Sequence, residues 1–298
     1  TPEQTAHAVA LCATMGLSLG AARSGEHVAQ WKGLAAPGAA FEAIHLVRLA
    51  QAGITGPLHV FEGPMGLRQA LGKDFGIRWD SEGYDGILAC SIKKHNAEFH
   101  AQSLIDAVLE LRTRFELKAA DVQRIDVEIF KAAYEMIGGG KYVNPRTVRT
   151  KEDADHSLPY LVAVALIDGQ VQPEQFEESR IQREDVQELM RRVESRERHR
   201  FTAEYPMRLH ERVTAHGCEG KPIQVEKREY EGFFARPMAW EAVMEKFRGL
   251  CGTALPEERQ NRVIEYVRGV EQRPITELFA ALAPSHGAGS VPSPMERS

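Results

Sequence analysis

Three short stretches of this sequence place ionisable side chains among apolar or turn-forming residues. The first is Trp31-Lys32-Gly33, in which Lys32 stands at the start of a helix-forming segment rich in small residues. The N-terminal end of a helix already carries positive partial charge, so a lysine there is electrostatically unfavourable by itself. Lysine and helix end together suit the binding of a carboxylate. The alternative interpretation of Lys32 is an ordinary exposed side chain.

The second stretch, SIKKHNAEFHAQS, covers residues 91–103 and is the densest in ionisable groups. Five of them fall within eight positions: Lys93, Lys94, His95, Glu98 and His100. Histidine is the side chain best suited to proton transfer near neutral pH. This stretch is therefore the best catalytic candidate in the chain. The alternative is a polar loop in which Asn96 caps the following helix.

The third stretch, DADHSLPY, covers residues 153–160 and precedes an apolar helix-forming segment. Ser157 is a suitable N-cap, and Pro159 suits a first helical turn. In this arrangement Tyr160 points from the start of the helix toward a cleft. The alternative is a half-buried core tyrosine whose hydroxyl is hydrogen-bonded.

Composition and motifs argue against several classes of protein. The four cysteines, Cys12, Cys90, Cys218 and Cys251, form no CxxC pair, so we expect no metal site built from neighbouring cysteines. Gly138–Gly140 lacks the Lys-Ser/Thr of a phosphate-binding loop, and no GxSxG nucleophile motif occurs. We expect no cofactor. The scattered thiols suit a reducing cytoplasm.

Charge and hydropathy give no reason to expect nucleic acid or a membrane. The formal net charge is −5, and the basic run Arg191–Arg200 lies among acidic residues, which predicts a solvated helix face. The apolar stretch Ala8–Ala22 is too short and too interrupted to span a bilayer, and it lacks the basic start of a signal peptide.

The pattern of apolar residues predicts helices at both ends of the chain and a mixed segment between them. Two Ala-rich segments near the start are apolar nearly all round, which predicts burial on several sides. The expected helices are Glu3–Ala22, Gly33–Ala52, Pro64–Leu71, His100–Phe115, Leu158–Asp168, Glu184–Val193, Met238–Leu250 and Pro256–Gly269. The expected strands are Val122–Phe130, Arg208–Thr214 and Pro222–Glu229.

This order predicts a mixed α and α+β fold, with a mainly helical domain interrupted by a smaller α/β domain. The helical domain would comprise residues 1–87 and 232–282, and the inserted domain residues 88–231. Residues 283–298 are rich in Gly, Ser and Pro and are expected to form a disordered tail.

Taken together and in order, the three stretches resemble the MmgE/PrpD family. The segment WKGLAAPGAAFEAIHLVRLAQAGITGP, followed by FEG, is similar to the family's lysine before an Ala-rich helix and a Gly-Pro turn. SIKKHNAEFHAQSLIDAV and DADHSLPYLVAVALIDGQV look like the corresponding motifs of the family's 2-methylcitrate dehydratase branch. The resemblance covers the chain up to about Leu282.

The resemblance implies the fold predicted above, a homodimer, and an active site in the cleft between the two domains. By position, Lys32, His100 and Tyr160 match family active-site residues, and Lys93 matches the lysine of the second motif. The expected activity is a hydro-lyase that removes water from a tricarboxylate by acid/base catalysis without metal. We expect His100, Tyr160 and Lys93 to be catalytic. We expect Lys32, Lys94 and His156 to bind substrate.

Family members carry a long helical segment before anything that matches Thr1, and that segment also contributes groups to the cleft. The chain is therefore expected to be a fragment or to need an N-terminal partner polypeptide, with little activity by itself. Three alternatives remain: a cis-aconitate decarboxylase-like activity, epimerisation of an imino diacid on the same scaffold, and an inactive subunit that keeps the fold.

Overall fold

The computed structural model contains the whole chain, and the structure describes residues 1–16, 19–25, 27–76, 83, 86–142, 144–217, 220–252 and 254–283. The chain forms two compact units, Thr1–Pro237 and Met238–Ser298. Helices predominate, and four strands of the first unit form one sheet. The predicted class, mixed α and α+β, is confirmed.

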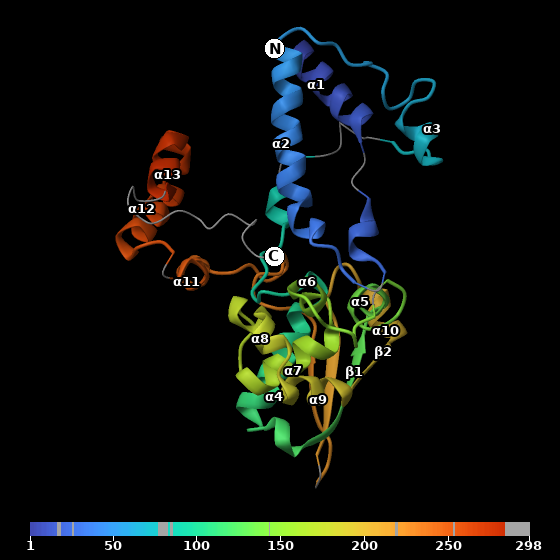
Figure 1. Cartoon of the computed structure of the whole chain (residues 1–298), viewed down its shortest axis with the longest axis vertical. Helices are drawn as coiled ribbons and strands as arrows, with labels where there is room; N and C mark the ends of the chain where they lie inside the picture. The colour runs from blue at the N-terminus through green and yellow to red at the C-terminus, as the bar shows by residue number, and fades with distance from the viewer. Residues whose placement is uncertain are drawn as a thin grey trace, which may run out of the picture. The chain divides into compact units, whose positions relative to one another are not determined.

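The first unit begins with two long helices that pack against each other, α1 (Pro2–Met15) and α2 (Trp31–Gln51) (Figure 1). Thr1 caps α1 in a reciprocal capping box with Gln4, and Pro2 occupies the first turn, where a missing N–H costs nothing. A short 3₁₀ helix (Gly20–Arg23) lies between them in sequence, and α3 (Leu67–Leu71) follows.

These first helices are much less buried than their composition predicts. Within the chain, α1 buries Ala8 and Ala10, and α2 buries Leu46 and Ala50. Five large apolar side chains of α2 remain exposed: Trp31, Leu34, Phe41, Ile44 and Val47. We call these five residues the α2 apolar surface. The expectation that both helices are buried on several sides is wrong for this chain by itself, because α2 packs along one side against α1.

A mixed four-stranded sheet organises the rest of the first unit. Its strands are β1 (Val122–Ile129), β2 (Val193–Glu197), β3 (Glu211–Gly217) and β4 (Ile223–Lys227), in the order β2-β1-β3-β4. Strand β2 runs parallel to β1, and the other pairs are antiparallel. The predicted strands at β1, β3 and β4 are confirmed. Cys218 and Glu219, which connect β3 to β4, lie outside the described residues.

The structure of the run Arg191–Arg200 differs from the prediction. It was expected to be a solvated helix face, but it supplies the last turn of α9 (Glu184–Arg191), strand β2 and the start of α10 (His199–Glu204). In β2 more exposed and less exposed side chains alternate, as they do in a strand. Arg196 pairs with Glu128, its direct neighbour in the parallel register with β1. The charges therefore belong to cross-strand ion pairs on the open side of the sheet.

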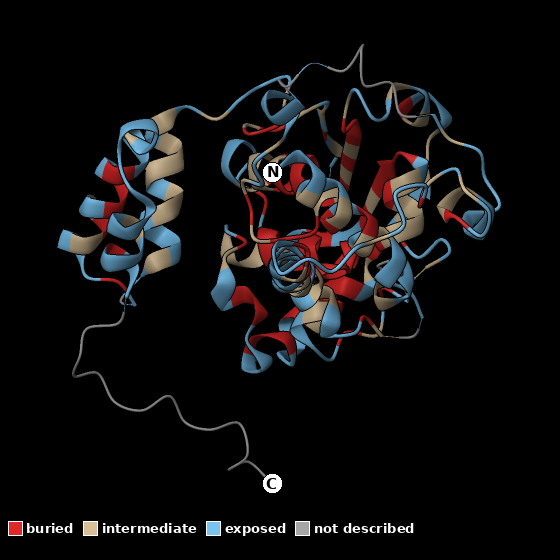
Figure 2. Cartoon of the chain, turned by 90° about the horizontal axis from the view of Figure 1, so that it is seen from above, coloured by how far each residue is buried: buried red, intermediate tan, exposed pale blue. Residues whose placement is uncertain are grey.

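Helices α4 (Gln102–Arg114), α7 (Leu158–Asp168) and α9 pack together over the sheet. Helix α7 has the predicted bounds: Ser157 accepts a hydrogen bond from the Tyr160 N–H, and Gly169 ends the helix with a φ of 75°. Its residues from Leu158 to Leu166 are buried. Figure 2 shows the buried positions gathered in the body of this unit.

Shorter helices complete the first unit. They are α5 (Lys131–Ile137), α6 (Lys151–Asp155) and α8 (Glu178–Ile181), with 3₁₀ turns at Gly86–Ala89, Phe99–Ala101, Ala119–Asp121 and Pro173–Phe176. Residues from α4, β1, α5, α7 and β3 share one apolar core. The sheet and its helices thus form a closed body, against which the polar motifs can be held rigidly.

The second unit is a small helical assembly. It contains α11 (Trp240–Cys251), α12 (Glu257–Arg268), a 3₁₀ turn (Val270–Gln272) and α13 (Ile275–Leu282), around a minor core of Leu255, Val263 and Ala281. The predicted helices at α11 and α12 are confirmed, and α13 was not predicted. The predicted division into residues 1–87 with 232–282 and residues 88–231 stays a prediction. The predicted tail lies, apart from Ala283, outside the described residues.

No helix among the described residues is both long enough and apolar enough to cross a membrane.

Candidate functional site

The segment before α2 is fastened to α6 by the first aspartate of the DADH sequence. Asp153 forms a capping box with Thr150 at the start of α6. Its carboxylate also accepts a hydrogen bond from the Val28 N–H at 3.0 Å and lies 3.1 Å from His27 Nδ1. Burial raises the pKa of Asp153, but the backbone hydrogen bonds from Val28 and Arg149 outweigh it and lower the pKa. A buried, ionised aspartate therefore fixes where α2 begins.

The second aspartate receives Lys32 from the first turn of α2. Lys32 Nζ lies 2.7 and 2.8 Å from the two carboxylate oxygens of Asp155, and Lys151 Nζ lies 3.0 Å from one of them. Burial lowers the pKa of Lys32, and the attraction of Asp155 opposes this shift. Burial raises the pKa of Asp155, but His156 and Lys32 reverse the shift and hold that pKa far below its usual range.

His156 is buried next to both partners. Its Nδ1 is in close contact with Asp155 Oδ1 and lies 3.2 Å from Lys32 Nζ. A carboxylate can only accept a hydrogen bond, so the contact with Asp155 requires the hydrogen of His156 on Nδ1. His156 therefore donates to Asp155, and Nε2 is left as its second ring nitrogen.

A second histidine–carboxylate pair stands at the start of the α4 region. Glu98 caps the 3₁₀ turn Phe99–Ala101 by accepting a hydrogen bond from the His100 N–H at 2.6 Å. Its other oxygen lies 3.0 Å from His100 Nδ1, within ion-pair distance. Burial raises the pKa of Glu98, but contacts with His100 and the charge of His156 lower it. A carboxylate there favours a proton on Nδ1 of His100 and leaves Nε2 for chemistry.

The two pairs belong to one cluster. The Glu98 N–H donates to the Asp155 carbonyl at 3.1 Å, which joins the second and third sequence motifs through their backbones. His156 and Glu98 are close enough for the charge of His156 to lower the pKa of Glu98. Lys32, His100 and His156 are thus brought together, as the three motifs suggested.

The remaining predicted residues lie at different distances from this cluster. Lys93 is exposed, and its positive charge helps to lower the pKa of Lys32, so it lies at the edge of the same cluster. Lys94 Nζ instead contacts Asp106 of α4 at 3.0 Å, beside His95 Nε2 at 2.9 Å from the same carboxylate. Lys94 therefore serves a separate ion pair, and its predicted role in substrate binding stays a prediction that this geometry does not favour.

Tyr160 is not at a cleft. Its side chain is fully buried in the core, and its hydroxyl donates to the carbonyl of Gln175. Burial raises the pKa of Tyr160 well above its usual value. Ser157 and Pro159 correctly predicted the start of α7. The direction of the Tyr160 side chain, however, depends on which side of α7 packs against the 3₁₀ turn Pro173–Phe176, and the local sequence does not determine this packing. We therefore leave Tyr160 out of the proposed machinery.

Three residues of the cluster were missed. Asp155 and Glu98 were quoted within the motifs without a role, and their position next to each histidine was a usable signal. Tyr205, whose hydroxyl lies 3.3 Å from His100 Nε2, has no local signal, because it follows α10 more than a hundred positions later in the sequence.

The arrangement combines proton carriers with positive charge. His100 and His156 each have a carboxylate beside Nδ1, and Lys32, Lys151 and Lys93 supply three positive charges around them. Such a set can hold an acidic ligand and exchange protons with it. Within the described ranges, no group of three or more His, Cys, Asp or Glu side chains is placed to hold a metal ion.

Comparison with known proteins gives the same assignment over most of the chain. The family model of the MmgE/PrpD C-terminal domain matches residues 95–272, and that of the MmgE/PrpD N-terminal domain matches residues 1–80. The 2-methylcitrate dehydratase of Escherichia coli K12 is 24% identical over 295 residues, covering 94% of this chain and 60% of the relative. The Salmonella typhimurium enzyme of the same name is 25% identical over 61% of this chain and 39% of its own length.

Human cis-aconitate decarboxylase is 22% identical over 214 residues, covering 68% of this chain and 42% of its own length. The chain therefore spans about 60% of the length of the E. coli relative and less of the other two.

Proposed function

Because the chain belongs to the MmgE/PrpD family, we propose that it forms most of a hydro-lyase, a carbon–oxygen lyase that removes water from a tricarboxylate such as 2-methylcitrate. The observation that carries the proposal is the cluster of Lys32, Asp155, His156, Glu98 and His100. On the same grounds we propose a role in the methylcitrate cycle of propionate catabolism, in the cytoplasm.

The elimination requires a base for the proton on the carbon beside a carboxylate. His100 suits this role because the Glu98 carboxylate, 3.0 Å from Nδ1, favours a proton on that nitrogen and so leaves Nε2 as the proton acceptor. The negative charge of Glu98 also stabilises the imidazolium that forms when His100 takes the proton. The side chain of His100 is 14% exposed, enough for contact with a ligand.

Lys32 suits the role of holding a substrate carboxylate. It starts α2, so its ammonium adds to the positive end of the helix, and Asp155 keeps it in place. Lys151 and Lys93 add positive charge nearby. These lysines lie among the carboxylates Asp155 and Glu98, and ammonium groups held in this way suit the binding of a substrate carboxylate. No step proposed here needs a metal ion.

The direct test follows alkene formation from 2-methylcitrate by ultraviolet absorbance. We expect His100→Ala to reduce kcat by about 10²–10⁴-fold, the usual contribution of a general base. We expect Lys32→Ala to act mainly through KM. The matched controls are His199→Ala, whose ring is almost fully exposed, and Lys131→Ala, a surface lysine of α5. Wild-type turnover in both site variants would refute the assignment.

Decarboxylation of cis-aconitate is the second candidate, because the human decarboxylase also matches two thirds of the chain. The same lysines would hold the acid, and a histidine would return a proton to the carbon that loses carbon dioxide. Measuring released carbon dioxide from cis-aconitate, beside alkene formation from 2-methylcitrate, separates the two reactions.

The α2 apolar surface supports a partner. Phe41 is 75% exposed, and together with α1 the helix lines a hollow of about 760 Å³ bordered by Met15, Leu19, Trp31 and Glu42. Exposed apolar side chains that gather on one helix often mark a site of protein–protein contact. About 40% of the length of the E. coli relative lies outside the match. We propose that a helical polypeptide corresponding to that part packs on the α2 apolar surface.

Size measurement with and without that polypeptide tests the partner. We expect the two to form a complex of defined stoichiometry, and we propose that the complete assembly is a homodimer. Self-association of the chain through the same surface, unchanged by the added polypeptide, would contradict the proposal.

A further inference from the structure

Tyr205 is the aromatic hydroxyl that meets the proposed base. Its oxygen lies 3.3 Å from Nε2 of His100, the ring nitrogen that Glu98 leaves unoccupied. The ring of Tyr205 stacks on Phe130, with centroids 4.7 Å apart and planes 11° from parallel. The rings of Phe130 and His100 pack in a T-shaped arrangement, with their centroids 5.5 Å apart. One buried phenylalanine therefore positions both rings.

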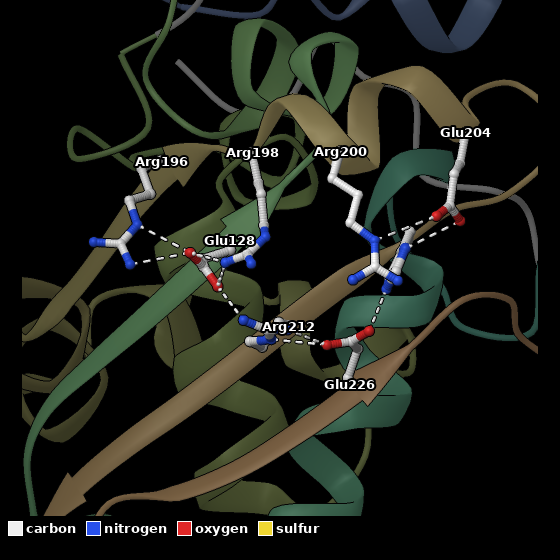
Figure 3. Close-up of polar contacts among 8 residues, drawn as sticks. Glu128, Arg196, Arg198, Arg200, Glu204, Arg212 and Glu226 are labelled. Carbon is white, nitrogen blue, oxygen red and sulfur yellow. Dashed lines mark hydrogen bonds and ion pairs between the residues drawn. The ribbon is translucent and has the colours of Figure 1, made fainter.

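The segment that carries Tyr205 is fixed by charges. Tyr205 directly follows α10, whose last residue, Glu204, binds Arg228 at 2.7 Å and lies 3.1 Å from His210 Nδ1. His210 is fully buried, and its Nε2 contacts Glu226 of β4 at 2.5 Å. Figure 3 shows Glu204 beside Arg200, and through His210 and Glu226 the contacts continue to Arg212.

Ion pairs from all four strands of the sheet help to hold α10 in place. Glu128 of β1 accepts contacts from Arg196, Arg198 and Arg212, and Arg212 also binds Glu226 (Figure 3). Because β1, β2, β3 and β4 all contribute to this network, the end of α10 is anchored to the whole sheet. Tyr205 is therefore presented to His100 from a rigid support, as a proton carrier has to be.

We propose that Tyr205 is the acid of the elimination: its hydroxyl gives a proton to the departing hydroxyl of the substrate while Nε2 of His100 takes the carbon-bound proton. This role rests on the hydro-lyase function proposed above. It places acid and base on one adjacent pair of side chains, with Glu98 as the positioning residue behind His100.

The proton and electron balance of the reaction closes within this pair. The carbon–hydrogen bond breaks, its proton moves to His100, and its electron pair becomes the second bond of the alkene. The carbon–oxygen bond breaks, and the oxygen takes its electron pair and the Tyr205 proton and leaves as water. The proton on His100 then passes to the Tyr205 phenolate, which restores both residues for the next turnover.

Two observations favour Tyr205 over Tyr160 as the acid. Tyr205 is 36% exposed, whereas Tyr160 is fully buried with its hydroxyl bound to a backbone carbonyl. Burial and the negative charge of Glu98 raise the pKa of Tyr205, which keeps its hydroxyl protonated at neutral pH. A proton donor has to begin the reaction in that form.

The test compares two leaving groups in the wild-type assembly, including the N-terminal polypeptide where turnover requires it. One substrate is 2-methylcitrate, and the other is the analogue with fluorine in place of the departing hydroxyl. Fluoride is stable as an anion and needs no proton to leave. We expect Tyr205→Phe to reduce kcat for dehydration by about 10²–10⁴-fold and to spare fluoride elimination. His100→Ala should lose both reactions.

Tyr205→Phe keeps the ring on Phe130, and Tyr266→Phe is the matched control because its hydroxyl contacts a backbone carbonyl in the second unit. As a second measurement, 3-fluorotyrosine at position 205 keeps the hydroxyl but makes it more acidic, so the alkaline limb of kcat should move to lower pH. Equal loss or equal retention of both reactions in Tyr205→Phe would overturn the role of Tyr205 alone. If the wild-type assembly turned over neither compound, the hydro-lyase function would fall as well.

Discussion

The α1–α2 hairpin and the sheet-centred body of the first unit are both rich in apolar residues, but only the body encloses most of its apolar side chains. In the body, α7 is buried along nearly its whole length and shares one core with the sheet. In the hairpin, α2 leaves most of its large apolar residues at the surface. The proposed site lies where the two regions meet, since Lys32 comes from the hairpin and His100 and His156 come from the body.

The hairpin and the body therefore contribute different parts of the proposed site. The body has the packing to hold the histidines and their carboxylates rigidly. The hairpin is attached to it through Asp153 and Asp155, two charged contacts within one short helix. We infer that the cation-bearing side of the site depends on whatever covers α2, whereas the proton-carrying side does not.

The largest difference is expected from equivalent truncations in the two regions. Leu161→Ala in α7 removes a fully buried side chain and should lower the free energy of unfolding by about 2–5 kcal/mol. Ile44→Ala in α2 removes an exposed one and should change it by less than about 0.5 kcal/mol. Chemical denaturation of the isolated chain measures both. Equal effects would mean that the hairpin is packed as the body is.

The next effect concerns the α2 apolar surface alone. Phe41→Glu should leave the isolated chain folded but weaken binding of the proposed helical partner by roughly 30-fold or more, about 2 kcal/mol for the loss of a central aromatic contact. Titration calorimetry with the partner polypeptide gives the affinity. Lys73→Glu, on the loop after α3, changes charge in the same direction without touching this surface, and it should bind normally.

A smaller change in stability is expected at low pH, where the contact between Lys32 of the hairpin and Asp155 of the body is lost. The pKa of Asp155 in the folded chain is far below its unfolded value, so its stabilisation is present above about pH 4 and is lost as the pH falls further. Asp155→Asn should reduce stability at pH 7 by roughly 1–3 kcal/mol, since Lys32 loses its buried partner, and should flatten the acid dependence. Thermal melts between pH 3 and pH 7 compare the two proteins. An unchanged acid limb would contradict the assigned contact.

The smallest expected change in stability concerns a buried carboxyl group inside the sheet-centred body. Glu211 is fully buried, and burial raises its pKa well above the usual value, a shift that the Leu104 N–H opposes only in part. A raised pKa stabilises the fold below the unfolded value near 4 and costs stability as the pH rises. Glu211→Met should therefore stabilise the chain by about 1 kcal/mol at pH 7. Destabilisation in thermal melts would show an unrecognised partner.

Elements with strong local signals were predictable from the sequence. Helix α7 carries a cap at Ser157 and a stop at Gly169, and β1 alternates apolar and polar residues from Ile125 to Ile129, so both were placed within one or two residues. Strand β2 was missed because its side chains are charged and its partner, β1, lies far away in the sequence. Charge alternation by itself does not separate a strand from an exposed helix face.

The site was predictable in its histidines and its lysine but not in their partners. Lys32, His100 and His156 lie within distinctive motifs, and the structure brings them together. Tyr205 reaches His100 only through the packing of α10 against α5, which no local pattern records. Tyr160 shows the reverse case, since a correct helix start still left the direction of its side chain undetermined.

The most direct test of the central claim is a reconstitution. Alkene formation from 2-methylcitrate is followed for the chain alone, for the N-terminal polypeptide alone and for the two mixed, with wild-type and Lys32→Ala versions of this chain. We expect turnover in the wild-type mixture, little or none in either component, and a large loss of activity at limiting substrate with Lys32→Ala. An inactive wild-type mixture, or a Lys32→Ala mixture as active as the wild type, would contradict it.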